Sequence, residues 1–194
     1  MNIDIFGNLN NPKVLVIGVF HGDEPQGDYL IRKYFSENQE TNLALIPRLN
    51  QAATRVNPNG VDLNRNFPTK NWELTERNEF FGGENPASEE ETKFVIETVE
   101  KLNPLLILTL HAPFKIVNYD GDAREIVEEI SAIIGYPVEG NIGYPTPGSF
   151  GTWAGIEKGI PVITLELDEE VNVEELEKPV FKIFRMLESY TPSP

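Results

Sequence analysis

Two histidines and a few carboxylates at the ends of apolar runs have the types and spacing needed for chemistry. His21 and Glu24 are three residues apart just after the apolar run at 13–19, and His111, the second of only two histidines, follows the run at 105–110. Two histidines and a carboxylate form a catalytic zinc site with a fourth position open for water. Zinc acidifies water and polarises a carbonyl, so the chemistry would be hydrolysis of an amide at neutral pH.

Glu166 lies inside a further apolar run, at residues 160–167. A carboxylate among leucines is costly to bury unless it has a partner or a function. Beside a metal it can take the proton of water and pass it to the leaving amine, so Glu166 is the candidate general base. Each residue also has a structural interpretation: a surface His-x-x-Glu pair, a hydrogen-bonded core His111, and a Glu166 paired with an arginine. Considered together, the two histidines and Glu166 favour function.

Residues 47–86 lack sustained periodicity and are rich in asparagine, proline and glycine. Long irregular stretches in compact domains are usually functional or disordered, and the aromatic residues and arginines here favour function. Arg55 and Arg65 are either surface salt-bridge residues or forked groups that bind a substrate carboxylate. Asp62 either caps a turn or accepts a hydrogen bond from a zinc-bound histidine.

The elements that must position these residues follow from hydrophobic patterning. Continuous apolar runs predict four buried strands, at residues 13–19, 42–46, 105–110 and 160–167. Helices are expected after Pro25, from Ser88 to Leu102 with a Ser88–Glu91 capping box, from an Asp122–Glu125 cap to Gly135, near 152–158, and over 174–188 with its regular part starting at Pro179. Strands that alternate with helices predict an α/β fold with a largely parallel sheet. Ligands of such sheets bind beyond the carboxyl ends of the strands, where His21, His111 and Glu166 are expected to meet.

Composition limits the partners and the compartment. A chain of 194 residues predicts one domain spanning 1–194, and its net charge of -15 argues against nucleic acid or an anionic membrane as partner. The absence of cysteine excludes disulfides, thiol catalysis and cysteine-bound metal. The N-terminus lacks a signal-peptide pattern and no apolar run is long enough to span a bilayer, so a cytoplasmic protein is expected. The oligomeric state stays open.

Four motifs together resemble those of the zinc metallocarboxypeptidases. They are Gly18-Val-Phe-His-Gly-Asp-Glu24, Asn59-Gly-Val-Asp-Leu-Asn-Arg-Asn-Phe-Pro68, the strand-end His111 and Thr164-Leu-Glu-Leu167. The run Gly143-Tyr-Pro-Thr-Pro-Gly-Ser-Phe-Gly151 is similar to that of the bacterial murein peptide amidases, which cleave the γ-D-glutamyl–diaminopimelate bond of peptidoglycan fragments during cytoplasmic recycling. The resemblance extends in order from Lys13 to Leu167.

The resemblance implies a mixed, mostly parallel sheet, one zinc ion, a small peptide substrate and a set of residue roles. His21, Glu24 and His111 would bind the zinc, and Glu166 would be the general base and acid. Arg55 would polarise the scissile carbonyl, while Asn64 and Arg65 would hold the carboxylate of the released residue. Asp62 would orient His21, and Tyr144 would close over the substrate.

The sequence departs from this pattern at Leu49-Asn50-Gln51-Ala52, where the amidases usually carry Asn-Pro-Asp-Gly. Arg48 and Arg55 are therefore both candidates for the residue that polarises the scissile carbonyl. The distance along the sequence to Asp-Leu-Asn-Arg favours Arg55. Two other functions remain open. One is an N-acyl amino acid deacylase of the aspartoacylase and succinylglutamate desuccinylase type, which shares His-Gly-x-Glu and Asp-Leu-Asn-Arg. The other is a binding module that has lost catalysis.

Overall fold

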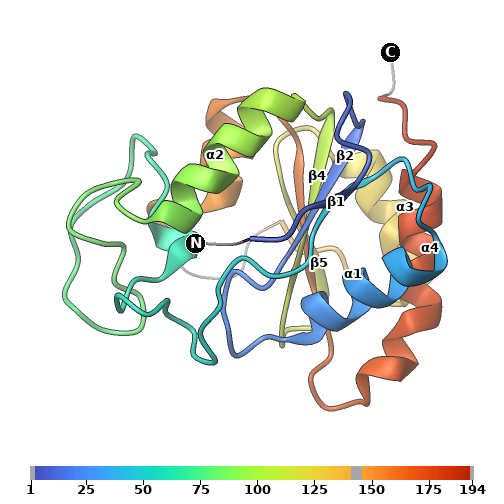
Figure 1. The fold of residues 1–194 in the computed structure, drawn as a ribbon, viewed down its shortest axis with the longest axis horizontal. Coiled ribbons are helices and arrows are strands. Elements are labelled where there is room, and N and C mark those ends of the chain that lie inside the picture. Colours follow the sequence, from blue (N-terminus) through green and yellow to red (C-terminus); the bar gives the residue numbers. More distant parts are fainter. Residues whose placement is uncertain (1–2, 141–145, 193–194) are drawn as a thin grey trace.

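One mixed β-sheet with helices on both faces forms the body of the protein (Figure 1). The computed structural model describes residues 3–140 and 146–192. In this part of the chain the sheet has six strands in the order β1-β3-β2-β4-β6-β5. Their bounds are β1 (Phe6–Gly7), β2 (Val14–Gly18), β3 (Ala44–Ile46), β4 (Leu106–His111), β5 (Ile116–Asp120) and β6 (Val162–Glu166).

The four strands predicted from apolar runs are the inner, parallel ones. β2 pairs in parallel with both β3 and β4, and β4 pairs in parallel with β6. The two edge strands, β1 and β5, are antiparallel to their neighbours and have no continuous apolar run that would predict them. The expected α/β class with a mostly parallel sheet is confirmed, with two antiparallel edges added.

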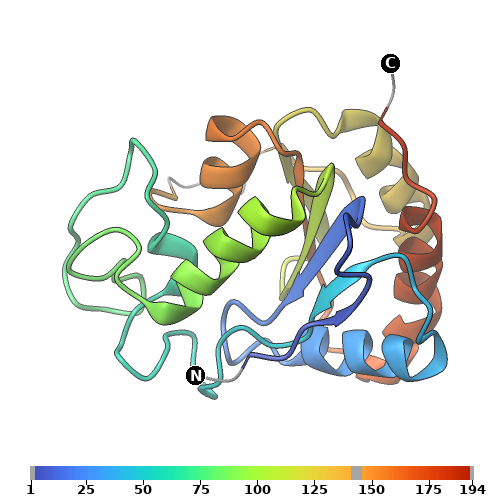
Figure 2. The same ribbon diagram turned by 45° about the horizontal axis from the view of Figure 1, so that its top comes forward.

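Helices cover both faces of the sheet (Figure 2). The helices α1 (Gln26–Glu37), α3 (Arg124–Ile134) and α4 (Glu177–Leu187) pack on one face. The helix α2 (Glu90–Leu102) and the short π-helix η2 (Thr152–Glu157) pack on the other. Two 3₁₀ turns, η1 (Leu63–Arg65) and η3 (Val173–Leu176), complete the helical elements of the described residues.

Side chains of each strand alternate between these two faces, as the pleat of a strand requires. In β4, Leu106, Leu108 and Leu110 join the core under α1, α3 and α4. Ile107 joins the core under α2 and η2, and Thr109 and His111 continue the same face toward the strand's carboxyl end. The face under α2 and η2 therefore becomes polar at this end of the sheet.

The predicted helix ends are partly wrong. Ser88 and Glu91 form no capping box, because α2 starts after Glu89 without a side-chain cap and the Ser88 hydroxyl bonds to Glu89 and Asn66 instead. The Asp122–Glu125 cap is also absent, since Ala123 precedes α3. Gly135 ends α3 at a φ of 82°, as expected of a glycine stop.

The helical segment predicted from residue 174 is present, but its regular part starts at Glu177, before the predicted Pro179. The turn η3 leads directly into α4 at Glu177, so Pro179 lies inside the first turn instead of starting the helix. A proline is tolerated there because the first-turn N–H groups have no partner within the helix.

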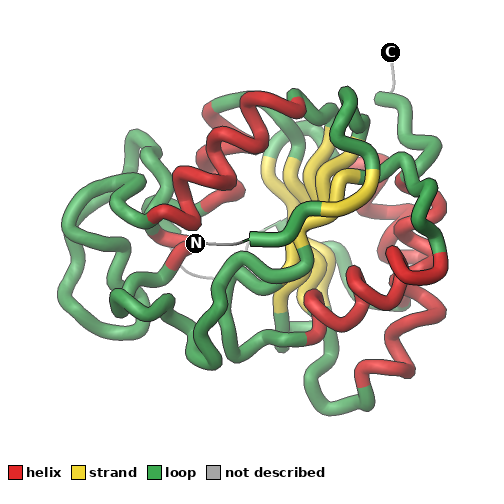
Figure 3. Tube along the Cα trace, in the orientation of Figure 1, coloured by secondary structure: helices red, strands yellow, loops and turns green. Residues whose placement is uncertain are grey.

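Residues 47–89 contain no strand and only the turn η1, and their loops extend to one side of the sheet (Figure 3). Asparagine side chains bridge these loops. The Asn50 amide donates to the backbone carbonyls of Thr54 and Arg55, and the Asn66 amide donates to Gly82. The irregular stretch is thus held by specific hydrogen bonds. Over residues 3–140 and 146–192, no helix has the length and apolar character to cross a membrane.

Candidate metal-centred active site

The loop after β2 places His21 and Glu24 at the carboxyl edge of the sheet. Val19 adopts a φ of 55°, which is costly for a β-branched residue, and its carbonyl accepts a hydrogen bond from the Asn50 N–H at 2.9 Å. The Gly22 N–H donates to Thr54, and a Cβ at Gly22 would approach the Ala52 carbonyl oxygen to 2.2 Å. Only glycine fits this contact between the two loops.

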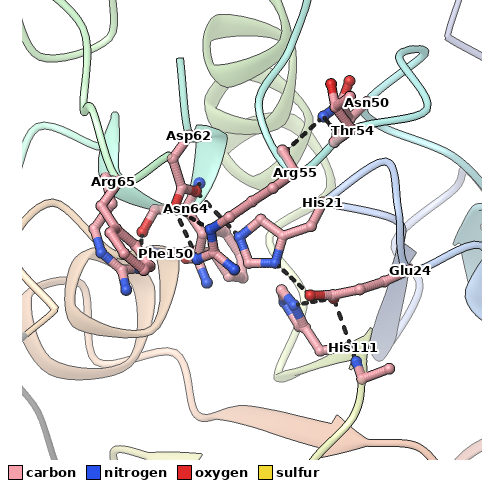
Figure 4. Close-up of polar contacts among 12 residues, drawn as sticks. His21, Glu24, Asn50, Thr54, Arg55, Asp62, Asn64, Arg65, His111 and Phe150 are labelled. Carbon is pink, nitrogen blue, oxygen red and sulfur yellow. Dashed lines mark hydrogen bonds and ion pairs between the residues drawn. The ribbon is translucent and has the colours of Figure 1, made fainter. Parts of the chain in front are cut away.

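His21, Glu24 and His111 form a compact cluster of side chains that could hold a metal ion (Figure 4). His21 Nδ1 lies 2.8 Å from Glu24 Oε1, and His111 Nδ1 lies 3.0 Å from Glu24 Oε2. One ligand atom from each residue lies within 4.8 Å of the others. Two imidazole nitrogens and a carboxylate at this spacing fit zinc, and a site with three protein ligands would leave a fourth position for water or substrate.

Asp62 fixes the orientation of His21 from the opposite side. His21 Nε2 donates to Asp62 Oδ1 at 3.1 Å, and Asp62 is fully buried. Arg55 bonds to Asp62 Oδ2 through Nη2 at 2.8 Å and Nε at 3.2 Å, and the Asn64 N–H donates to Oδ1. When the proton is held on Nε2, Nδ1 is the atom of His21 that can bind a metal. Carboxylates behind metal-binding histidines usually fix the tautomer and the ring orientation in this way.

Hydrogen bonds within the cluster shift the pKa values of His21, Glu24 and Asp62. Burial disfavours the His21 imidazolium, but hydrogen bonds to Asp62 and Glu24 outweigh burial and raise the pKa of His21 to about 9. Burial likewise opposes ionisation of Glu24, yet its contacts with His111 and His21 lower the pKa of that carboxyl to about 2. Despite burial, contacts with His21 and Arg55 hold the pKa of the Asp62 carboxyl well below its usual range. To hold a metal ion, His21 would have to give up the proton on Nδ1 while Nε2 keeps its proton against Asp62.

His111 and Glu166 are neighbours at the ends of adjacent parallel strands. The His111 ring stacks on Phe20 at 5.5 Å between centroids, which holds its orientation. Glu166 is 7% exposed and lines the cavity, and its Oε2 has no hydrogen-bond partner among the described residues. Burial raises the pKa of the Glu166 carboxyl. A carboxylate of raised basicity with one unbonded oxygen, beside the His21–Glu24–His111 cluster, is suited to general-base catalysis.

A cavity of about 980 Å³ brings these groups together with Arg55, Asn64 and Arg65. Arg55 lies over the Phe80 ring at 4.9 Å while bound to Asp62. Asn64 Oδ1 accepts from the Phe150 N–H at 2.9 Å, and Arg65 Nη1 donates to the Asn64 carbonyl. Figure 4 shows Asp62, Asn64 and Arg65 on one side of His21, with Glu24 and His111 on the other.

Arg48 lies outside the cavity lining, unlike Arg55. Its guanidinium donates to Asp28 at 3.2 Å and to the carbonyls of Asn50 and Ala52, so it braces the loop that carries Arg55. Tyr144, the expected substrate-closing residue, falls outside the described residues.

The cavity continues along the sheet face beyond the predicted residues. Thr109 and Thr164 form a hydroxyl pair on β4 and β6, and β5 adds Asn118 and Asp120. Sequence reasoning missed Asp120 because β5 was not predicted. The available signal was the β-forming run Ile-Val-Asn-Tyr before Asp120 and Gly121.

Comparison with known proteins agrees with this geometry. A model of the zinc carboxypeptidase family matches residues 45–133. Murein peptide amidase A of Vibrio campbellii is 30% identical over 178 residues, which cover 81% of this chain and 70% of that protein. The chain belongs to the zinc carboxypeptidase family. As a member of this zinc-dependent family it is a hydrolytic enzyme. This finding argues against the alternative of a binding module that has lost catalysis.

One further relative and two solved structures are similar to this chain. Murein peptide amidase A of Escherichia coli K12 is 32% identical over 149 residues, which cover 71% of this chain and 61% of that protein, so the match spans less than two thirds of that relative. The solved murein-tripeptide amidase MpaA of Escherichia coli O157 superposes with a TM-score of 0.80 at 25% identity, covering 97% of this chain and 85% of that one. Carboxypeptidase A of Helicoverpa armigera, at a TM-score of 0.74 and 16% identity, supports the fold alone.

Proposed function

We propose that this protein is a zinc-dependent amidase that cleaves the γ-D-glutamyl–diaminopimelate bond of small murein peptides, and that its residues act as one catalytic domain. The observation that carries the proposal is the convergence of the His21–Glu24–His111 cluster, Glu166 and Arg65 in one cavity. The names of the relatives from Vibrio campbellii and Escherichia coli support the choice of substrate.

The three cluster residues would hold one zinc ion, which supplies Lewis-acid activation of water and of the scissile carbonyl. Glu166 takes the proton of the attacking water and delivers it to the leaving amine. Glu166 lines the cavity, its Oε2 has no hydrogen-bond partner among the described residues, and burial stabilises the protonated form that delivers the proton, so the residue fits both steps.

Arg55, Asn64 and Arg65 bind the substrate in this proposal. Arg55 stabilises the oxygen of the scissile carbonyl as negative charge develops there, and Asp62 keeps its guanidinium in place. Asn64 and Arg65 hold the carboxylate of the residue that is released. Arg65 presents a forked donor suited to a carboxylate, and its backbone is fixed by the close approach of Gly82 and Gly148 to its carbonyl.

The murein peptides concerned are cytoplasmic fragments in recycling, so the proposal places the protein in the cytoplasm. The deacylase alternative predicts a different substrate, an acyl group on a small amino acid. Both reactions use the same cluster, so product analysis must separate them.

Mass spectrometry of products tests the proposal directly. Zinc-loaded protein is incubated with L-Ala-γ-D-Glu-meso-diaminopimelate, beside a chelated sample and beside N-acetylaspartate and succinylglutamate as alternative substrates. Release of free diaminopimelate in the zinc-loaded sample alone is the expected result. Turnover of the acylated amino acids with none of the peptide would replace the amidase by the deacylase.

A further inference from the structure

Arg55 is held at one edge of its guanidinium by a single oxygen atom of Asp62. Its Nε and Nη2 both donate to Asp62 Oδ2, at 3.2 and 2.8 Å (Figure 4). The third nitrogen, Nη1, has no hydrogen bond to any described residue. Two parallel bonds to both oxygens of a carboxylate fix a guanidinium in its plane, whereas two bonds to one oxygen let the plane pivot. Asp62 alone therefore leaves one movement of Arg55 free.

The ring of Phe80 lies against the face of the same guanidinium. Arg55 Cζ lies over the ring, 4.9 Å from its centroid, and both residues line the cavity. The face of an aromatic ring is negative and attracts a cation that lies over it. Phe80 thus restrains the face of the guanidinium while Asp62 restrains its edge, and Nη1 is left for the substrate.

The backbone around Phe80 is anchored to the site. The Phe80 N–H donates to Asn78 Oδ1 at 2.7 Å. The next residue, Phe81, is 2% exposed, and its carbonyl accepts from the Asp62 N–H at 2.8 Å. The ring is therefore presented by a fixed backbone, which also bonds to Asp62, the other residue that restrains Arg55.

The contact with Arg55 can be tested without disturbing the core. The Phe80 side chain is 42% exposed and belongs to neither hydrophobic core of the described residues. Single exposed apolar side chains are common and contribute little to stability. A change of the Phe80 ring should therefore act through Arg55 and leave the fold intact.

We propose that Phe80 is a positioning residue, which holds the Arg55 guanidinium by a cation–π contact so that Nη1 meets the oxygen of the scissile carbonyl. A donor that is fixed before the reaction stabilises developing negative charge better than one that must be ordered during it. The ring also keeps water from one face of the guanidinium, which strengthens the attraction for that charge. This inference rests on the proposed function for the role of Arg55 in catalysis.

The first test is the kinetics of zinc-loaded Phe80→Leu and Phe80→Tyr on L-Ala-γ-D-Glu-meso-diaminopimelate. Leucine removes the ring face, so kcat should fall about 2- to 30-fold, the range of a cation–π contact, while KM stays close to that of the wild type. Tyrosine keeps the ring face and should keep kcat. A rise in KM at unchanged kcat in Phe80→Leu would place the ring against the substrate instead, and would overturn the proposal, as would no change in either constant.

Fluorinated phenylalanines at position 80 separate the charge of the ring from its shape. Each added fluorine withdraws charge from the ring face, so kcat should fall stepwise with the number of fluorine atoms. Phe6 is the matched control, because Arg32 lies over its ring at 5.6 Å outside the cavity lining. The same fluorination at Phe6 should leave kcat unchanged.

The effect of fluorination must also depend on the cation. In Arg55→Gln the series at position 80 should no longer alter kcat, because the charge that the ring attracts has been removed. An equal stepwise fall in Arg55→Gln, or no fall in the protein that retains Arg55, would overturn the proposal. Thermal melting of each variant verifies that it is folded.

A measurement without substrate separates this inference from the proposed function. The NMR order parameter of the Arg55 Nε–H in the zinc-loaded protein reports how firmly the guanidinium is held. It should fall in Phe80→Leu and keep the wild-type value in Phe80→Tyr and in Phe6→Leu. This result supports the positioning of Arg55 by Phe80 even if the murein peptide is not cleaved. An order parameter that does not respond to Phe80→Leu would overturn the inference, including when cleavage itself is normal.

Discussion

Replacing Asp62 by asparagine should weaken zinc binding without removing any proposed ligand. Asp62 is fully buried and accepts the His21 Nε2 proton at 3.1 Å. Its second oxygen holds Arg55 at 2.8 and 3.2 Å. Asparagine keeps the shape but removes the charge that fixes the tautomer of His21 and neutralises Arg55. Outer partners of this kind typically change metal affinity or activity by about 10- to 100-fold, so the zinc Kd should rise by that factor.

The assay is competition for zinc against a chromophoric chelator at fixed pH. Asp4→Asn is the matched control, because it removes a carboxylate that pairs with Arg32 on the surface at 2.8 Å. Arg55→Gln separates the two partners of Asp62: it should keep zinc affinity near that of the wild type while turnover falls. A zinc Kd for Asp62→Asn equal to that of Asp4→Asn would show that Asp62 does not support His21.

Three more predictions follow from the same contacts. Arg65→Ala should lower kcat/KM about 10- to 100-fold on peptides with a free terminal carboxylate, and much less on their amidated forms, as parallel kinetics would show. Burial raises the pKa of the Asp120 carboxyl, so its ionised form opposes folding. The melting temperature of Asp120→Asn minus that of the wild type should therefore increase from pH 4 to pH 7. A difference that does not change with pH would contradict this. Gly22→Ala should cause a large drop in melting temperature, because the new Cβ meets the Ala52 carbonyl oxygen at 2.2 Å.

The inner strands could be predicted because burial on both faces leaves a continuous apolar run. The run at residues 105–110 became β4, and His111 ends it. The edge strand β5 has one buried residue in five, so it lacks such a run, and Asp120 went unnoticed with it. The Ser88–Glu91 cap failed for another reason: Asn66, far away in sequence, binds the Ser88 hydroxyl.

Strand topology also explains how much of the site could be predicted. His21, His111 and Glu166 were expected together because parallel strands end at one edge, and the structure places all three around one cavity. The Arg55–Asp62 ion pair depends on how the irregular loops fold, which periodicity does not report. The role of Arg48 as a brace for residues 50–52 is another tertiary contact that spacing alone leaves open.

The central claim is that Glu166 performs proton transfer beside a zinc ion held by His21, Glu24 and His111. The rate of diaminopimelate release by zinc-loaded Glu166→Gln, at a zinc content equal to that of the wild type, tests it most directly. General acid–base assistance contributes about 10²- to 10⁴-fold, so the rate should fall by at least that range. A rate close to that of the wild type, with zinc retained, would remove Glu166 from the mechanism.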